Sequence, residues 1–178
     1  MSLILLLGGA RSGKSALAVR WGRAHDGPVT FVATAEAADD EMAQRIARHR
    51  AARPAGWTTV EERTAVAEAV RAADPRAMVI VDCLTLWLAN VLDRADDDVL
   101  AWARGIATAA HSRHAPTVVV SNEVGWGIVP ADPTTRRYRD LLGEINALMA
   151  ARAHHSMLLV AGRAVVLQTA PPRATELF

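Results

Sequence analysis

Short runs of apolar residues alternate along this chain with longer stretches in which apolar positions recur at helical spacing. Uninterrupted apolar runs are typical of strands covered on both faces of a sheet, and a period near 3.6 residues is typical of helices. The pattern predicts strands at residues 3–7, 29–33, 78–82, 117–121, 157–161 and 164–168. It predicts helices at residues 14–25, 39–52, 64–73, 85–92, 97–113 and 134–153.

This alternation of strands and helices predicts an α/β fold, with a mostly parallel sheet and helices on both of its faces. Only Gly162 and Arg163 separate the last two apolar runs. Two residues are too few for a crossover, so we expect these runs to form an antiparallel hairpin at the end of the sheet. At 178 residues the chain has the size of one domain, and we expect residues 1–178 to form it.

Composition and charge exclude several classes of protein. The chain has 20 Lys and Arg and 19 Asp and Glu, for a net charge of +1, which argues against a non-specific nucleic-acid binder. Its one cysteine, Cys83, excludes a disulfide framework and a multi-cysteine zinc site. The apolar run at residues 3–7 is too short for a signal peptide or a membrane span, so we expect a cytoplasmic protein.

A phosphate-binding loop follows the first predicted strand. Its residues fit the pattern G-x-x-x-x-G-K-[ST] in full: Gly8, Gly9, Ala10, Arg11, Ser12, Gly13, Lys14 and Ser15. Backbone N–H groups of such a loop surround the phosphates, the lysine reaches the β- and γ-phosphates, and the hydroxyl can bind Mg²⁺. Lys14 is the chain's one lysine, which suggests a position where a planar guanidinium would not serve. The loop predicts a site for a nucleoside triphosphate.

A second acidic position lies at the end of the predicted strand 78–82. Four apolar residues precede Asp82, as in the strands whose terminal carboxylate holds Mg²⁺ in nucleotide-binding proteins. Ser15 and Asp82 are therefore candidate metal ligands. Taken alone, Asp82 fits a cap of the helix beginning near Thr85 equally well.

The lysine count also narrows the class of nucleotide protein. Regulatory GTPases read guanine with an N/T-K-x-D motif, and no such motif exists when Lys14 is the one lysine. A small-molecule kinase fits the chain length, because phosphoryl transfer needs mainly positioning and charge stabilisation.

The predicted helix at residues 39–52 carries unusual side chains. Glu41, Arg45, His49 and Arg53 follow one another at i+4 steps and share one face. Neighbouring cations favour a neutral imidazole, which can act as a nucleophile while the arginines hold a phosphate. Spacing alone favours a solvated helix face with a bystander histidine.

Several segments resemble the bifunctional cobinamide kinase/cobinamide-phosphate guanylyltransferases of cobalamin biosynthesis. They are GGARSGKS, the helix at residues 39–53 with the following Pro54 and Trp57, VDCLTLWLAN, SNEVGWGIVP and RRYRDLLGEIN, in order over nearly the whole chain. The resemblance implies a RecA-like P-loop domain that assembles as a homotrimer. It also implies phosphorylation of adenosylcobinamide by ATP or GTP, then transfer of GMP from GTP through a GMP–histidine intermediate.

The resemblance assigns roles residue by residue. His49 is the histidine of the matching helix and takes the role of nucleophile, and Lys14 serves catalysis at the phosphates. Beyond the phosphate loop, the family's nucleotide contacts fall on Thr34, Ala35, Glu36, Arg50, Ala51, Ala52, Arg53, Glu61 and Asp82.

The sequence leaves open the role of Glu123 and two alternative functions for the chain. Glu123 fits a base, a metal contact or a ribose contact as well as a turn-stabilising carboxylate. A monofunctional P-loop kinase for another small alcohol would need no histidine nucleophile. A non-catalytic nucleotide-binding subunit would bind nucleotide without turnover.

Overall fold

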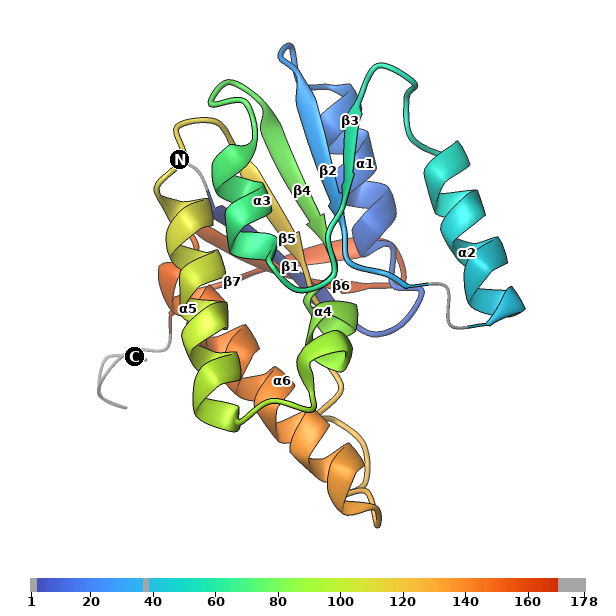
Figure 1. The fold of residues 1–178 in the computed structure, drawn as a ribbon, viewed down its shortest axis with the longest axis vertical. Helices are drawn as coiled ribbons and strands as arrows, with labels where there is room; N and C mark the ends of the chain where they lie inside the picture. The colour runs from blue at the N-terminus through green and yellow to red at the C-terminus, as the bar shows by residue number, and fades with distance from the viewer. Residues whose placement is uncertain (1–2, 37–38, 170–178) are drawn as a thin grey trace.

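The computed structural model describes residues 3–36 and 39–169, in which seven strands form one sheet (Figure 1). The strands are β1 (Leu3–Gly8), β2 (Val29–Ala33), β3 (Thr58–Glu61), β4 (Met78–Asp82), β5 (Thr117–Val120), β6 (His155–Val160) and β7 (Arg163–Leu167). The helices are α1 (Lys14–Arg23), α2 (Asp40–Ala51), α3 (Val66–Ala72), α4 (Leu84–Val91), α5 (Asp96–His111) and α6 (Pro133–Arg152).

The sheet has the order β3-β2-β4-β5-β1-β6-β7. Every neighbouring pair is parallel except β6 and β7, which form the predicted antiparallel hairpin. Strand β5 lies between β1, which leads into the phosphate loop, and β4, which ends at Asp82. The carboxyl ends of these three strands therefore meet at one edge, where open α/β sheets bind their ligands.

Strand β3 is the one strand that the hydrophobic pattern missed. Its four residues, Thr58 to Glu61, pair in parallel with β2 at the edge of the sheet. Edge strands are exposed, and three of these four residues are exposed. A short polar edge strand gives no apolar run from which to predict it.

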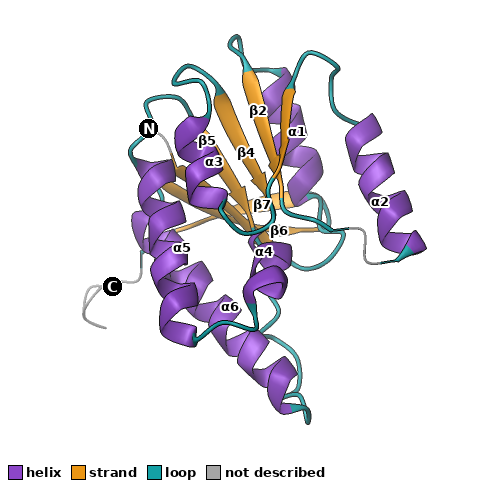
Figure 2. Ribbon diagram, in the orientation of Figure 1, coloured by secondary structure: helices purple, strands orange, loops and turns teal. Residues whose placement is uncertain are grey.

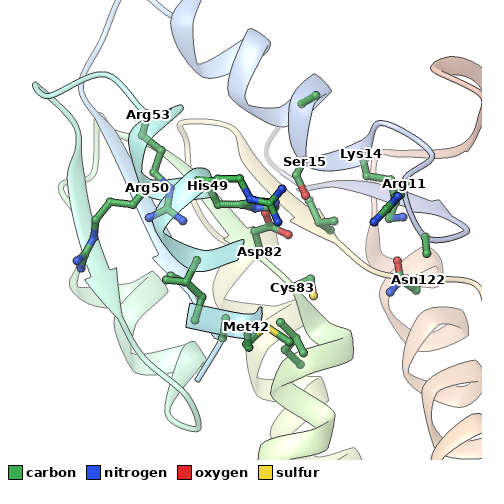
Figure 3. A pocket seen from close by; sticks show the side chains of 18 of the residues that line it. Arg11, Lys14, Ser15, Met42, His49, Arg50, Arg53, Asp82, Cys83 and Asn122 are labelled. Carbon is green, nitrogen blue, oxygen red and sulfur yellow. The ribbon is translucent and has the colours of Figure 1, made fainter. Parts of the chain in front are cut away.

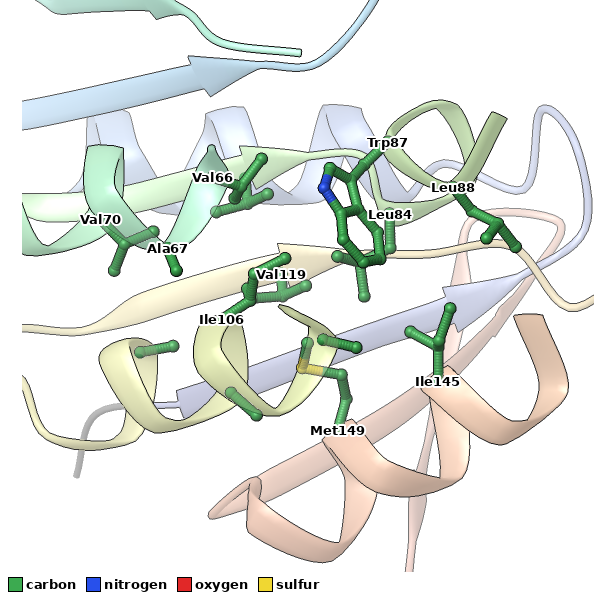
Figure 4. Close-up of a cluster of buried hydrophobic side chains, with 14 of the residues drawn as sticks. Val66, Ala67, Val70, Leu84, Trp87, Leu88, Ile106, Val119, Ile145 and Met149 are labelled. Atoms are coloured by element: carbon green, nitrogen blue, oxygen red, sulfur yellow. The ribbon is translucent and has the colours of Figure 1, made fainter. Parts of the chain in front are cut away.

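Helices cover both faces of the sheet (Figure 2). Along β1, Leu3, Leu5 and Leu7 join the core beneath α3 to α6, whereas Leu6 joins the core beneath α1. This alternation is the period of two expected of a strand. Trp87 of α4 is fully buried in the larger core, and its indole Nε1 donates to the carbonyl oxygen of Thr64 at 2.9 Å (Figure 4).

Helix α2 stands outside the sheet beside α1, and its C-terminal end is fixed in place (Figure 1). The guanidinium of Arg23 on α1 donates to the carbonyl oxygen of Ala52, with an Nη2–O distance of 2.7 Å. The ring of Trp57 packs against Gly22 of α1 so closely that a Cβ there would lie 2.5 Å from it. These contacts hold the end of α2 against the C-terminal end of α1.

In the described part of the chain, no helix combines the length and the apolar character needed to cross a bilayer.

Candidate functional site

A cavity of about 1000 Å³ opens at the carboxyl ends of the central strands, between the phosphate loop and α2 (Figure 3). The predicted site residues that line it are Ala10, Arg11, Ser12, Gly13, Lys14, Ser15, Ala35, Glu36, His49, Arg50, Arg53, Glu61 and Asp82. Segments far apart in the sequence thus contribute to one space, which is large enough for a nucleotide.

The phosphate loop is built around the ammonium of Lys14. Its Nζ donates to the carbonyl oxygens of Gly8 and Gly9 at 2.8 and 2.7 Å and to Ser12 Oγ at 3.2 Å. Gly8 and Gly9 do not line the cavity. Their carbonyl oxygens hold the ammonium of Lys14 in place. A Cβ at Gly8 would lie 2.3 Å from the carbonyl oxygen of Leu159, so no larger residue fits there.

Ser15 and Asp82 meet on the floor of the cavity. The Ser15 hydroxyl donates a hydrogen bond to the Asp82 carboxylate. Burial raises the pKa of Asp82, and that hydrogen bond and the charges of His49 and Arg53 lower it only in part. A buried carboxylate beside a hydroxyl is the oxygen donor set that Mg²⁺ prefers. The described residues contain no cluster of three or more His, Cys, Asp or Glu side chains that could hold a metal on their own.

His49 reaches the cavity from the last turn of α2. This helix begins at Asp39, whose side chain accepts a hydrogen bond from the backbone N–H of Met42 at 2.7 Å. The imidazole lies close enough to Asp82 for their charges to interact, so the nucleophile candidate and the metal candidate share one site.

Two arginines flank the histidine. Arg53 lies over the ring of Phe31, and burial lowers the pKa of its guanidinium while the charge of Asp82 raises it. Arg50 forms an ion pair with Glu61 of β3. The side chain of Arg45, predicted on the same face, lies outside the part of the chain that the structure describes.

Thr34, Ala51 and Ala52 do not line the cavity. Thr34 is fully buried, and its hydroxyl donates to the carbonyl oxygen of Cys83 at 2.7 Å and accepts from the Cys83 N–H at 2.8 Å. It therefore fixes the turn after Asp82. Ala51 and Ala52 are exposed at the end of α2.

Sequence reasoning missed four lining residues that bear on the site: Arg63, Met42, Leu86 and Asn122. Arg63 forms an ion pair with Glu36 at the cavity wall. Asn122 lies two residues after β5 and had a usable signal, because it is a polar residue just beyond the carboxyl end of a central strand.

Other polar residues have structural partners instead. The carboxylate of Glu123, a half-buried residue that does not line the cavity, accepts a hydrogen bond from the N–H of Gly125 at 2.8 Å, which favours the turn-stabilising interpretation. Arg137 donates to Asp96 and to the carbonyl oxygens of Leu92 and Arg94. Burial raises the pKa of the Cys83 thiol to about 11, so this lining residue stays a neutral thiol.

The chain resembles solved structures in fold. A protein of Pyrococcus horikoshii superposes with a TM-score of 0.55 at 10% identity, over 93% of this chain and 85% of that one. An ATPase of a type III secretion system superposes with a TM-score of 0.54 at 12% identity, over 89% of this chain and 51% of that one. Together with the phosphate loop, these likenesses confirm the predicted P-loop NTPase fold.

Similarity in sequence is much closer to two bacterial proteins. A bifunctional adenosylcobalamin biosynthesis protein of Pseudomonas aeruginosa is 42% identical over 169 residues, which cover 94% of this chain and 98% of the relative. The protein of the same description from Escherichia coli is 36% identical, over 93% of this chain and 99% of the relative. The family model of cobinamide kinase / cobinamide phosphate guanyltransferase matches residues 4–167. The chain therefore belongs to the cobinamide kinase / cobinamide phosphate guanyltransferase family.

Proposed function

We propose that this enzyme phosphorylates adenosylcobinamide and then transfers GMP to the product, using one cavity for both steps. In the first step the hydroxyl of the aminopropanol arm attacks the γ-phosphorus of ATP or GTP. The bond to the β-phosphate oxygen breaks, the nucleoside diphosphate leaves, and the hydroxyl proton is released.

In the second step His49 is the nucleophile. A ring nitrogen attacks the α-phosphorus of GTP, pyrophosphate leaves, and a GMP–histidine phosphoramidate forms. A phosphate oxygen of adenosylcobinamide phosphate then attacks the same phosphorus, the P–N bond breaks, and adenosyl-GDP-cobinamide is released. Splitting the transfer in this way replaces one difficult displacement by two easier ones.

The phosphate loop serves both steps. Lys14 and the backbone N–H groups of the loop would bind the β- and γ-phosphates, which leave as diphosphate in the second step. Arg50 and Arg53 flank His49 and would stabilise the charge that develops on the attacked phosphorus. Nucleotide contacts by Ala35, Glu36 and Glu61 are part of the same proposal, and their place in the cavity lining supports it.

Mg²⁺ fits the pair formed by Ser15 and Asp82, a hydroxyl oxygen next to a buried carboxylate. When bound there, the ion would neutralise charge on the phosphates of the nucleotide.

The observation that carries the proposal is the shared cavity of His49 and Lys14, which come from different segments of the chain. A monofunctional kinase or a binding subunit would have no use for an imidazole facing the phosphate loop. We also propose, from the sequence and the resemblance, a cytoplasmic homotrimer, which light scattering and cell fractionation would test.

The test is the intact-protein mass after incubation with GTP and Mg²⁺. Wild type should gain the mass of GMP in an acid-labile form, and His49→Ala should not. His114→Ala, which alters an exposed histidine that does not line the cavity, is the matched control and should form the adduct normally. No adduct on wild type would favour a kinase alone, and an adduct on His49→Ala would move the nucleophile elsewhere.

A further inference from the structure

Asn122 occupies a position in the cavity that the proposed mechanism does not use. It follows β5 by two residues, and it lines the cavity together with Val120. Alternate residues of an extended chain have their side chains on the same face, so the side chain of Asn122 lies on the same face as that of Val120. Figure 3 shows the side chain of Asn122 below Lys14 and Arg11, with its amide oxygen on their side.

The backbone around Asn122 is held to the phosphate strand. The N–H of Ser121 donates to the carbonyl oxygen of Leu6 at 2.9 Å, and the N–H of Glu123 donates to that of Gly8 at 3.1 Å. Hydrogen bonding between the β1 segment and the β5 segment thus continues beyond the last residue of β5, as far as the phosphate loop. The segment cannot shift without disturbing Gly8, whose carbonyl also accepts from Lys14.

Two further residues fix the peptide groups of Asn122 itself. Its N–H donates to Thr85 Oγ1 at 3.0 Å, and its carbonyl oxygen accepts from Asn146 Nδ2 at 2.9 Å. Both backbone groups are therefore engaged by side chains, from α4 and from α6. The side-chain amide remains to face the cavity.

Asn146 is an unusual residue at its place in α6. It is 6% exposed and lies in a helix whose inner face is otherwise formed by Leu142, Ile145 and Met149, all fully buried. A buried amide is unfavourable unless it is hydrogen-bonded, and its Oδ1 has no partner within the described residues. The bond to Asn122 is thus the interaction that its burial serves.

We propose that the side-chain amide of Asn122 donates a hydrogen bond to the terminal phosphate of the bound nucleoside triphosphate, with Thr85 and Asn146 as positioning residues. A half-turn about its last side-chain bond brings the amide N–H to the side of Lys14 and Arg11, where it can donate to a phosphate oxygen. The amide is neutral and does not repel these cations. This proposal rests on the nucleotide site of the proposed function.

The contact between Asn122 and the terminal phosphate would let the enzyme distinguish a nucleoside triphosphate from a nucleoside diphosphate. A nucleoside diphosphate has no terminal phosphate at that position, so it would lose nothing when the amide is removed. Asn122 would then favour binding of the substrate over retention of the diphosphate product.

Calorimetry on the full chain with Mg²⁺ tests this directly, with GDP and with a non-hydrolysable GTP analogue that has a β,γ-imido bridge. A hydrogen bond to a charged group contributes enough that Asn122→Ala should weaken the analogue about tenfold or more. GDP affinity should change by less than about twofold, because GDP lacks the group contacted. Ser121→Ala is the matched control, since its buried hydroxyl lies one residue away and has no partner among the described residues.

The outcomes distinguish this inference from the proposed function. Equal weakening of both ligands by Asn122→Ala, or no change in either, would overturn the inference alone. Failure of wild type to bind either nucleotide would overturn the nucleotide site and the inference with it.

The positioning role has its own test. Thr85→Val removes the acceptor for the Asn122 N–H and should lower the preference for the GTP analogue over GDP. Thr85→Ser keeps the hydroxyl and should restore that preference. If Thr85→Val lowers thermal stability but leaves the preference as in wild type, Thr85 does not position Asn122.

Discussion

The guanidinium carbon of Arg53 lies 3.6 Å from the centroid of the Phe31 ring. Phe31 belongs to β2 and is 2% exposed, whereas Arg53 comes just after the last turn of α2. The contact therefore joins the end of the helix that carries His49 to β2, the strand next to the edge strand β3. A cation–π contact of this kind contributes about 0.5–2 kcal/mol.

Arg53→Lys should slow formation of the GMP adduct by about 2- to 30-fold, because an ammonium cannot stack its plane on the Phe31 ring. Kinase activity should fall less, since it does not use His49. The rates are measured by intact mass and by single-turnover phosphorylation. Arg71→Lys on α3, an exposed arginine outside the cavity lining, is the control and should leave both rates unchanged. Equal losses in the two activities would show that Arg53 acts on the phosphates in general.

Lys14→Ala should lower both activities by about 10²–10³, because one phosphate site serves both steps. Lys14→Arg should not restore them. Three oxygens, from Gly8, Gly9 and Ser12, surround a compact ammonium that a planar guanidinium does not replace. Both reactions are followed with labelled nucleotide. Guanylyl transfer that survives in Lys14→Ala would require a second phosphate site.

The sequence predicted the sheet and helices well because the central strands are buried on both faces. Short apolar runs rich in β-branched residues, such as residues 78–82, are typical of strands inside a parallel sheet. The predicted helix bounds differ from those observed by a few residues, as helix ends are set by local caps that the period does not record. Strand β3 escaped prediction because its polar residues pair at the edge, where burial places little constraint on composition.

The candidate site was predicted in its contiguous parts and missed where it depends on packing. The phosphate loop has its own spacing signature, and Asp82 has a strand before it. Nothing in the spacing of α2 says that His49 faces the loop. That depends on distant contacts, such as Arg23 with the carbonyl oxygen of Ala52. Thr34 fell within a predicted contact segment, yet its hydroxyl is used by the Cys83 backbone.

Asp82→Asn should stabilise the metal-free protein near neutral pH while abolishing metal-dependent activity. Burial raises the pKa of Asp82 above that of an unfolded chain. The native state therefore binds more protons between the two pKa values, and the free energy of unfolding falls as pH rises through that window. Asparagine cannot be charged, so the variant escapes this loss.

Thermal melts from pH 4 to pH 8 measure the effect. The Tm difference between Asp82→Asn and wild type should widen with rising pH, by about 2–4 °C for each kcal/mol regained. Added Mg²⁺ should raise the Tm of wild type and not of the variant. A Tm difference that does not depend on pH would mean that burial does not raise the pKa of the Asp82 carboxyl group.

Glu123→Ala should change both activities by less than about threefold, because Glu123 does not line the cavity and its carboxylate accepts a hydrogen bond from the nearby Gly125 N–H. The loss should be in stability, at about 0.5–1.5 kcal/mol. Steady-state assays and denaturant unfolding measure the two effects separately. A hundredfold fall in kinase rate with normal stability would instead give Glu123 the role of a base.

Gly22→Ala should both destabilise the protein and slow adduct formation, because the contact between Gly22 and Trp57 packs the core and also holds the end of α2. The new Cβ would lie 2.5 Å from the Trp57 ring and 3.1 Å from Ile80 Cδ1. Overpacking of this kind costs about 1–3 kcal/mol, and the ring must move away from α1. Because only residues 52–56 separate Trp57 from the end of α2, its displacement loosens the last turn that presents His49.

Gly143→Ala on α6 is the matched control, as another helical glycine but one with no atom near its would-be Cβ. The free energy of unfolding of Gly143→Ala should rise by about 0.5–1 kcal/mol, the usual gain when alanine replaces glycine within a helix. Trp57→Phe in the Gly22→Ala background should recover part of both losses, because the smaller ring makes room for the methyl group. Denaturant unfolding and the rate of adduct formation follow the two effects. If Gly22→Ala unfolds like wild type and forms the adduct at the same rate, Trp57 does not hold α2 against α1.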